Sequence, residues 1–190
     1  MKNIKAIIFD AYGTLFDVNS AAEKCKDQIG DKWEKFSNYW RTTQLEYTWL
    51  RSLMGRHKDF WEITEDSLEK SMENFNINRS MKNELLDLYK SLSTFEEVPE
   101  TLKILKEKNY KLAILSNGTP HLLNGLVRSN KLENLFDDLF SIEEVGIYKP
   151  DSKVYGMPTK KYNIKVNEVA FLSSKTWDVS GGGNYGYNAI

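Results

Sequence analysis

The chain has 190 residues, of which 41% are hydrophobic, and this is enough for a core in one or two compact domains. Its 26 basic and 27 acidic residues give a formal net charge of -1, which excludes a general attraction to nucleic acid or acidic membranes. No apolar stretch is long enough to cross a bilayer, the N-terminus lacks signal-peptide anatomy, and the single Cys25 cannot form an intrachain disulfide, so we expect a cytoplasmic protein.

The first predicted strand covers residues 4–10 and ends in Asp10. An apolar run, Ile7 to Phe9, precedes this aspartate and a glycine-containing turn follows it, as in a buried strand of a parallel sheet. Ligands of open α/β sheets bind at the carboxyl edge of the strands. Asp10 is therefore a candidate nucleophile or metal ligand, although an aspartate here can also simply cap a turn.

A long helical segment follows the first strand. Residues 21–93 are rich in Glu, Lys, Leu and aromatic side chains and show no strand-like alternation, and a further helix begins at Val98 with Pro99 in its first turn. We expect a discontinuous core domain, residues 1–15 and 98–190, interrupted by a helical cap domain, residues 16–97, that shields the site. Arg41 lies among large apolar residues, so it needs an anion or an acidic partner.

Three later segments also bring polar side chains to the ends of predicted strands or loops. Strands are expected at residues 111–116 and 168–173, with a weaker candidate at 139–141, and Lys149 stands in a loop before Pro150. Each polar residue has an ordinary explanation as a turn former or surface group, but four such sets at one sheet edge favour a site. The predicted fold class is α/β, a doubly wound parallel-sheet (Rossmann-like) core with an inserted helical cap domain.

These segments together resemble the motifs of the haloacid dehalogenase superfamily. The matching stretches are DAYGTLFD at residues 10–17, LSNG at 115–118, YKP at 148–150 and SSKTWD at 173–178. The stretch QLEYTWLRSLMG at residues 44–55 is similar to the L-2-haloacid dehalogenase branch in particular. The resemblance covers nearly the whole chain.

Tyr12 separates this branch from the phosphatases of the superfamily. Those enzymes carry a second aspartate two residues after the first, which handles leaving-group protons while Mg²⁺ neutralises the phosphate. A phenol cannot readily replace that carboxylate. The resemblance therefore implies hydrolytic dehalogenation of short-chain L-2-haloacids to D-2-hydroxyacids through an aspartyl ester on Asp10, with halide as a product, no cofactor, no metal, and a homodimer.

The resemblance also implies roles for individual residues. Lys149 and the hydroxyls of Thr14 and Ser116 would orient Asp10, while Arg41 and Asn117 would face the halide. The expected apolar wall around the substrate consists of Tyr12, Leu45, Phe60 and Trp177. Ser173 and the backbone of Ala11 and Tyr12 would meet the substrate carboxylate. Tyr155 and Asp178 match further positions needed for activity, Asp178 by fixing Lys149, and Lys175 lies within the fourth motif.

The chain departs from the branch at several positions. Lys175 replaces the usual asparagine, and a second lysine near Asp10 is expected to hold it as an ion pair and reduce its nucleophilicity. Gly156 and Pro158 interrupt the helix that carries Tyr155, so we expect a kink that turns this tyrosine away.

The C-terminal region departs as well. Gly182 and Gly183 are poor helix formers. The chain ends at Ile190, where the family continues through a further strand and helix, so an incomplete C-terminal end is expected. Two alternatives stay open: a Mg-dependent phosphatase of the same superfamily, and a catalytically silent, non-enzymatic member.

Overall fold

A five-stranded sheet forms the centre of the protein in the computed structural model, which describes residues 3–190. All its strand pairs are parallel and the strand order is β3-β2-β1-β4-β5. The strands are β1 (Ala6–Phe9), β2 (Lys111–Ser116), β3 (Asp138–Ser141), β4 (Val169–Leu172) and β5 (Asn188–Ala189). The four predicted strands are thus confirmed: β1 and β4 are shorter than predicted, β2 has the predicted bounds, and β3 begins one residue earlier. Strand β5 was not predicted, because two residues are too few to show periodicity.

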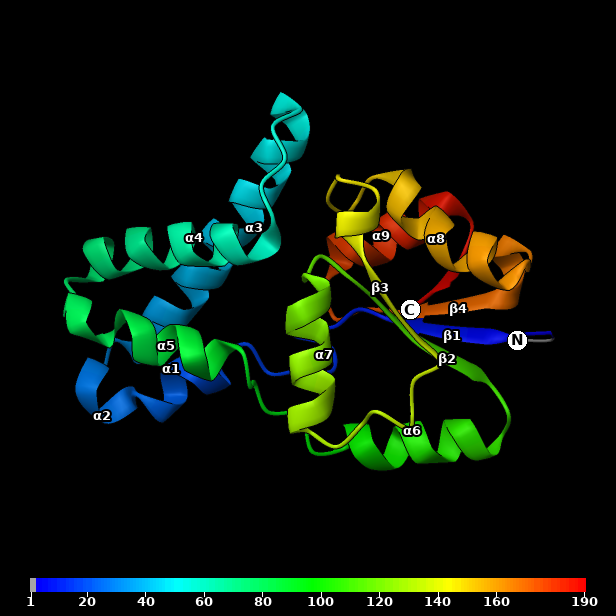
Figure 1. Cartoon of the computed structure of the whole chain (residues 1–190), viewed down its shortest axis with the longest axis horizontal. Helices are drawn as coiled ribbons and strands as arrows, with labels where there is room; N and C mark the ends of the chain where they lie inside the picture. Colours follow the sequence, from blue (N-terminus) through cyan, green and yellow to red (C-terminus); the bar gives the residue numbers. More distant parts are fainter. Residues whose placement is uncertain (1–2) are drawn as a thin grey trace.

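Helices cover both faces of this sheet. Helices α6 (Val98–Glu107) and α7 (Pro120–Ser129) lie on one face, and α8 (Ser152–Tyr162) and α9 (Thr176–Tyr185) lie on the other (Figure 1). This arrangement confirms the predicted doubly wound α/β class. Short 3₁₀ turns, Ile142–Glu144 and Val166–Glu168, complete the connections.

The order in which the chain adds strands to the sheet reverses between β1 and β4. From β1 the chain eventually proceeds to β2 on one side, whereas from β4 it proceeds to β5 on the other. Such a switch point leaves a crevice at the carboxyl ends of the two strands. Asp10 directly follows β1 and Ser173 directly follows β4, so both lie at this switch point.

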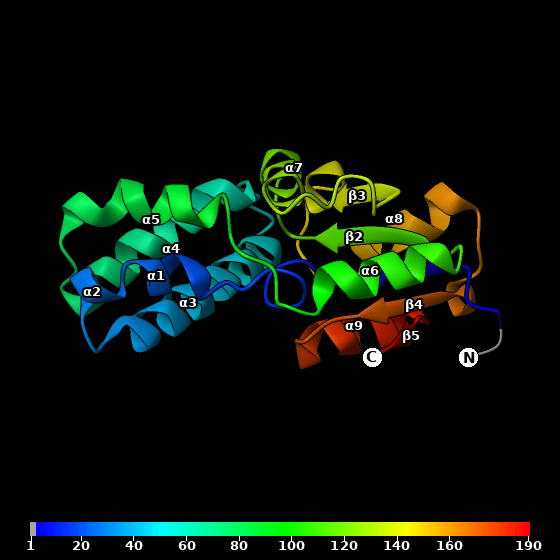
Figure 2. The same cartoon turned by 90° about the horizontal axis from the view of Figure 1, so that it is seen from below.

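A group of helices lies beyond the carboxyl ends of the strands (Figures 1 and 2). The two connections to it run side by side: the Asp17 N–H donates to the Ser93 carbonyl at 2.8 Å, and the Phe95 N–H donates to the Leu15 carbonyl at 3.2 Å. The predicted cap boundaries at residues 16 and 97 stay a prediction. The helices are α1 (Ser20–Lys24), α2 (Lys26–Ile29), α3 (Trp33–Met54), α4 (Phe60–Phe75) and α5 (Lys82–Tyr89), with a 3₁₀ turn at Arg79–Met81.

Helices α3 and α4 pack against each other. Helix α3 buries Phe36, Trp40, Gln44 and Thr48, which are four residues apart and therefore share one face. Helix α4 begins at a capping box in which Asp59 accepts a hydrogen bond from the backbone of Glu62 at 2.9 Å. Within the described residues, no helix is both long enough and apolar enough to cross a membrane.

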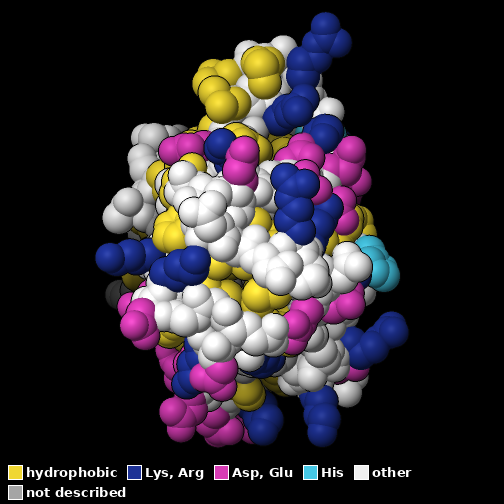
Figure 3. Space-filling view, turned by 90° about the vertical axis from the view of Figure 1, so that its left-hand side faces the viewer, with side chains coloured by type: hydrophobic (Ala, Val, Ile, Leu, Met, Phe, Trp, Pro, Cys, Tyr) yellow, Lys and Arg dark blue, Asp and Glu magenta, His cyan; other side chains and the backbone are white. Residues whose placement is uncertain are grey.

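The last turns of α3 project from the molecule. Leu50, Leu53 and Met54 are exposed here, Leu53 by 84%, and hydrophobic side chains are visible at this projecting end (Figure 3). Gly55 ends the helix in the left-handed conformation, with a φ of 62°. We call Leu50, Leu53 and Met54 the α3 patch.

Helix α8 corrects the expectation of a kink that displaces Tyr155. It continues through Pro158 to Tyr162, and Tyr155 is fully buried, with its ring 5.7 Å from that of Phe171. Packing of this large side chain outweighs the low helix propensity. The same packing explains why α9 carries glycines: a Cβ on Gly181 would collide with the Tyr155 hydroxyl, and a Cβ on Gly182 would lie 2.7 Å from Phe171.

Candidate active site

Asp10 is held at both carboxylate oxygens. Lys149 Nζ donates to Oδ1 at 3.1 Å, and Thr14 Oγ1 donates to Oδ2 at 3.2 Å. The Thr14 hydroxyl in turn accepts the backbone N–H of Ser174 at 2.9 Å, which ties the loop after β1 to the loop after β4. These contacts place Thr14 and Lys149 against Asp10, and their orienting roles in the reaction stay predictions.

Behind Asp10, a second buried carboxylate shares the same lysine. Lys149 Nζ lies 2.9 Å from Asp178 Oδ2, and the Tyr155 hydroxyl donates to Asp178 Oδ1 at 2.6 Å. Tyr187 donates to the Tyr155 carbonyl. Lys149 and Asp178 are almost completely buried, so this row of groups fixes the ammonium that contacts Asp10. Asp178 thus fixes Lys149, as expected.

The electrostatics of this row keep the lysine charged. Burial opposes the ammonium, but the adjacent Asp10 and Asp178 carboxylates outweigh burial and raise the pKa of Lys149. Burial, together with the negative charge of Asp10, raises the pKa of Asp178, although Lys149 acts in the opposite direction. One cation therefore serves two carboxylates in a site with little access to water.

Arg41 lies on α3 and reaches down to the loop after β1. Its Nη1 donates to Gln44 Oε1 at 2.7 Å and its Nη2 donates to the Tyr12 carbonyl at 3.3 Å. Its Nε is buried without a partner. The expected acidic partner of Arg41 is not found among the described residues, since both its acceptors are neutral. Arg41 is half-buried, so its positive charge is available to an anion that enters from outside the protein.

Aromatic side chains pack around Tyr12, in the loop that follows Asp10. The Tyr12 ring lies 5.2 Å from that of Phe60 and stacks on that of Tyr89 at 5.6 Å. Burial, with a smaller effect of Tyr89, raises the pKa of Tyr12 well above its usual value, so the phenol stays neutral. Trp177 of α9 packs edge-on against Trp49 of α3 at 5.5 Å, and Leu45 is buried on the same helix. Tyr12, Phe60 and Trp177 thus lie where the helical group contacts the sheet and its helices, and the wall around the substrate stays a prediction.

Ser116 and Asn117 differ from expectation in their partners. Ser116 Oγ is fully buried and accepts the Gly118 N–H at 3.0 Å, and no bond from Ser116 to Asp10 is found within residues 3–190. Ser116 thus shapes the loop after β2. Asn117 Oδ1 accepts the backbone N–H of Lys149 at 3.1 Å, which positions the lysine. Its predicted halide contact stays a prediction, as does the carboxylate contact of Ser173, whose Oγ accepts the Lys175 N–H at 3.2 Å.

The expected second ion pair on Asp10 is also absent from the described residues. The side chain of Lys175 lies over Gly13, where a Cβ would be 3.1 Å from its Cε. No described carboxylate lies within the 4.0 Å ion-pair limit of Lys175, and Lys149 alone pairs with Asp10. The reason is local geometry: Gly13, with a φ of 88°, turns the loop so that it presents bare backbone to Lys175.

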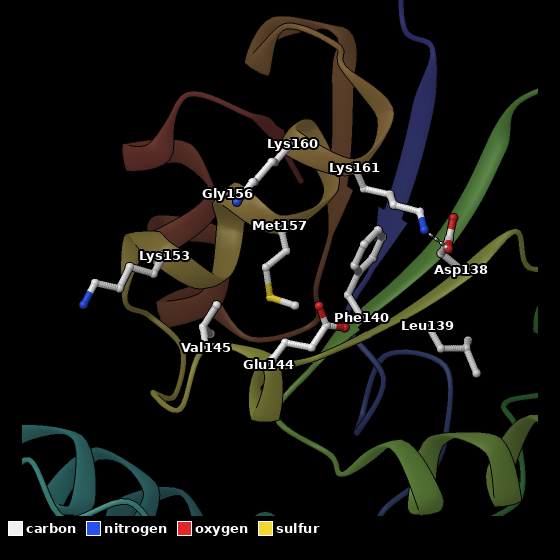
Figure 4. A pocket seen from close by; sticks show the side chains of 10 residues that line it. All are labelled: Asp138, Leu139, Phe140, Glu144, Val145, Lys153, Gly156, Met157, Lys160 and Lys161. Atoms are coloured by element: carbon white, nitrogen blue, oxygen red, sulfur yellow. Dashed lines mark ion pairs between the residues drawn. The ribbon is translucent and has the colours of Figure 1, made fainter.

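Other parts of the described chain offer no rival site. Within residues 3–190, no three His, Cys, Asp or Glu side chains are grouped closely enough to hold a metal ion. A groove between β3 and α8 is lined by Phe140 and Met157 and rimmed by lysines, with Lys161 paired to Asp138 at 3.8 Å (Figure 4). This groove contains none of the predicted site residues.

Sequence reasoning missed several residues of the site. Gln44 stands three positions after Arg41, so the two share a helix face, and this spacing could have identified it. Tyr89 and Tyr187 had no such signal, because they reach the site from distant parts of the chain.

Comparisons with known proteins agree with this geometry. The family model described as haloacid dehalogenase-like hydrolase matches residues 4–186. "(S)-2-haloacid dehalogenase 1" from Pseudomonas sp. (strain CBS-3) is 42% identical over 192 residues, which span 100% of this chain and 85% of the relative.

Two solved structures are similar over nearly the whole chain. A crystal structure described as that of a dehalogenase has a TM-score of 0.97 at 38% identity. The match covers 99% of this chain and 84% of the dehalogenase chain. The L-2-haloacid dehalogenase of Xanthobacter autotrophicus with chloropropionic acid covalently bound has a TM-score of 0.89 at 35% identity. The match covers 97% of this chain and 75% of the dehalogenase chain.

Proposed function

This chain belongs to the haloacid dehalogenase-like hydrolase family, and we propose that it hydrolyses short-chain (S)-2-haloacids to D-2-hydroxyacids. The observation that carries the proposal is that Lys149 and Thr14 hold Asp10, while Arg41, which donates to the Tyr12 carbonyl two residues later, has no acidic partner among the described residues. The relative with covalently bound chloropropionic acid supports a covalent route. Tyr12, where a phosphatase carries its second carboxylate, disfavours the phosphatase alternative.

In the first step, an Asp10 oxygen attacks C2 of the haloacid. A carbon–oxygen bond forms while the carbon–halogen bond breaks, and the bonding pair leaves on the halide with inversion at C2. Lys149 and Thr14 hold the carboxylate in a fixed orientation, which lowers the entropic cost of bringing the reacting atoms together. We place the departing halide beside Arg41, because its guanidinium contacts only neutral acceptors among the described residues.

In the second step, water attacks the carbonyl carbon of the Asp10 ester. The ester bond to Asp10 breaks, the 2-hydroxyacid leaves with the oxygen that Asp10 supplied, and the water oxygen remains in the regenerated carboxylate. Lys149 lies where it can stabilise the negative charge that develops on the carbonyl oxygen. Tyr12, Leu45, Phe60 and Trp177 would surround the alkyl group, and Ser173 with the backbone of residues 11 and 12 would bind the carboxylate.

The direct test is halide release from the two enantiomers of 2-chloropropionate. We expect release from the L form only, with D-lactate as the other product. The silent alternative predicts release from neither enantiomer, and release from both would contradict the proposed stereochemical course.

Halide release should be independent of metal. Lys149 supplies the charge next to Asp10, and attack on carbon leaves no phosphate charge to neutralise. We expect the same rate of chloride release from L-2-chloropropionate with EDTA as with added Mg²⁺. Phosphatase activity on p-nitrophenyl phosphate should be negligible in both. Turnover of the phosphate ester that requires Mg²⁺ would favour the phosphatase alternative.

We further propose that residues 16–97 act as a cap domain, that the protein is cytoplasmic, and that it forms a homodimer. The free, buried thiol of Cys25 supports the location. The α3 patch supports the dimer, because isolated apolar side chains are common on surfaces but three together on a projecting helix end are better covered by a second copy.

Replacing Leu53 with glutamate should weaken this dimer. A carboxylate in an apolar contact lacks a partner and is costly to bury. We expect sedimentation to show a mixture shifted to monomer at concentrations where the wild type is dimeric. Ile104→Glu is the matched control, because Ile104 is an exposed apolar residue on α6, away from the α3 patch. A wild type that is monomeric would contradict the dimer.

A further inference from the structure

The Arg41 guanidinium is held by neutral groups. Gln44 Oε1 and the Tyr12 carbonyl accept its Nη1 and Nη2 hydrogens, and its Nε is buried and unpaired. Among the described residues, no carboxylate lies within 4.0 Å of Arg41. The side chain is thus fixed in place while its positive charge remains unbalanced.

The Gln44 amide is itself fixed. It is 1% exposed, and its Nε2 donates to Thr64 Oγ1 at 2.6 Å and to the Tyr89 hydroxyl at 3.1 Å. Thr64 Oγ1 already donates to the Phe60 carbonyl at 2.7 Å, so it must accept from Gln44. The amide nitrogen therefore faces Thr64, and the oxygen is directed to Arg41.

We propose that Gln44 is a positioning residue that holds Arg41 for the departing halide without neutralising it. This inference rests on the proposed function. A glutamate here would hold the guanidinium equally well but would cancel much of its charge, and the halide would then gain less stabilisation as its charge develops. A neutral amide provides the same geometry and leaves the charge for the transition state.

Two further contacts connect this network to the substrate space. The Tyr89 ring stacks on Tyr12, and the Arg41 guanidinium carbon lies 5.7 Å from the centre of the Tyr12 ring. Both contacts limit the movement of Arg41 relative to the loop that follows Asp10. The position of the guanidinium is therefore set from α3 through Gln44 and from the sheet through Tyr12.

The test compares Gln44→Glu with the wild type on L-2-chloropropionate and L-2-bromopropionate, by halide release in a single turnover. Glutamate is nearly isosteric; it can accept from the Tyr89 hydroxyl, which lies 3.3 Å from Gln44 Oε1, and from the Thr64 hydroxyl once that hydroxyl turns away from the Phe60 carbonyl. We expect the chloride rate to fall by about 10-fold to 100-fold and the bromide rate by clearly less, because bromide is the better leaving group and needs less assistance. Product inhibition by bromide should weaken in parallel.

Two variants complete the design. Gln44→Met removes the acceptor without adding charge, so it should slow chloride release less than Gln44→Glu does. Thr48→Val is the matched control, a buried hydroxyl on the same helix that donates only to the Leu45 carbonyl, and should leave the bromide-to-chloride ratio unchanged.

The outcomes separate the inference from the proposed function. An unchanged bromide-to-chloride ratio and unchanged bromide inhibition in a folded Gln44→Glu protein would overturn the role of Gln44 while the dehalogenase function stands. Absence of halide release from the wild type would contradict the proposed function, and the inference with it.

Discussion

Replacing Asp10 with asparagine is expected to abolish halide release. The amide has nearly the same shape but lacks the negative charge and the nucleophilic oxygen, so the first step has no attacking group. A loss of at least about 1,000-fold is expected, because no other described carboxylate lies beside both Thr14 and Lys149. The measurement is chloride release from L-2-chloropropionate over long incubation.

Labelled water tests the covalent step directly. In a single turnover in heavy-oxygen water, the label should enter the Asp10 carboxylate and not the hydroxyacid, because the product takes its oxygen from Asp10. Mass spectrometry of the peptide containing Asp10 measures the heavy oxygen in its carboxylate. Asp138→Asn is the matched control, since Asp138 lies in the groove of Figure 4 and should retain full activity. Label in the product at the first turnover would show direct attack by water.

The central strands and Asp10 were predictable because their signal is local. The apolar run before Asp10 and the short polar turn after it specify a buried strand within ten residues. Four strands and the doubly wound class were recovered in this way. Strand β5 was missed because it consists of only Asn188 and Ala189, and its position depends on the close packing of α9 against Phe171.

The site was predictable where a motif names a residue and less so where tertiary contacts decide its partner. Asp10, Thr14, Lys149 and Asp178 come together as expected. Proline and glycine propensities wrongly predicted a displaced Tyr155, since propensity is a weak guide where a large buried ring packs. The position of the Lys175 side chain depends on the turn at Gly13, which no pattern in the sequence specifies.

Replacing Lys149 with methionine is expected to be nearly as damaging as loss of the nucleophile. The methionine fills a similar volume, but Asp10 and Asp178 lose the cation that serves them both. Removal of one partner from a buried ion pair costs about 3 kcal/mol or more of unfolding free energy. Halide release should fall by about 100-fold or more, since the ester carbonyl also loses its positive neighbour. Chemical denaturation and single-turnover halide release measure the two effects, with Lys153→Met on the exposed side of α8 as the control.

The pH dependence of this variant gives a sharper test. Without Lys149, burial and the negative charge of Asp10 raise the pKa of Asp178 still further above its value in the unfolded chain. Carboxyl groups whose pKa is raised by folding stabilise the protein while protonated, so stability should fall as the pH rises through the raised values. In the wild type the raised pKa of Lys149 has an effect of the same sign but at a much higher pH: its contribution is complete below about pH 10 and is lost as the pH rises through the raised pKa.

The double variant Lys149→Met, Asp178→Asn separates charge from packing. The asparagine oxygen can still accept the Tyr155 hydroxyl, and only one carboxylate remains without a cation. We expect this protein to regain part of the unfolding free energy lost in Lys149→Met, and to lose most of the fall in stability with rising pH. Halide release should stay low, because Asp10 still lacks its ammonium partner. If Lys149→Met were as stable as the double variant at pH 8, the shared lysine would not be the group that makes two buried carboxylates tolerable.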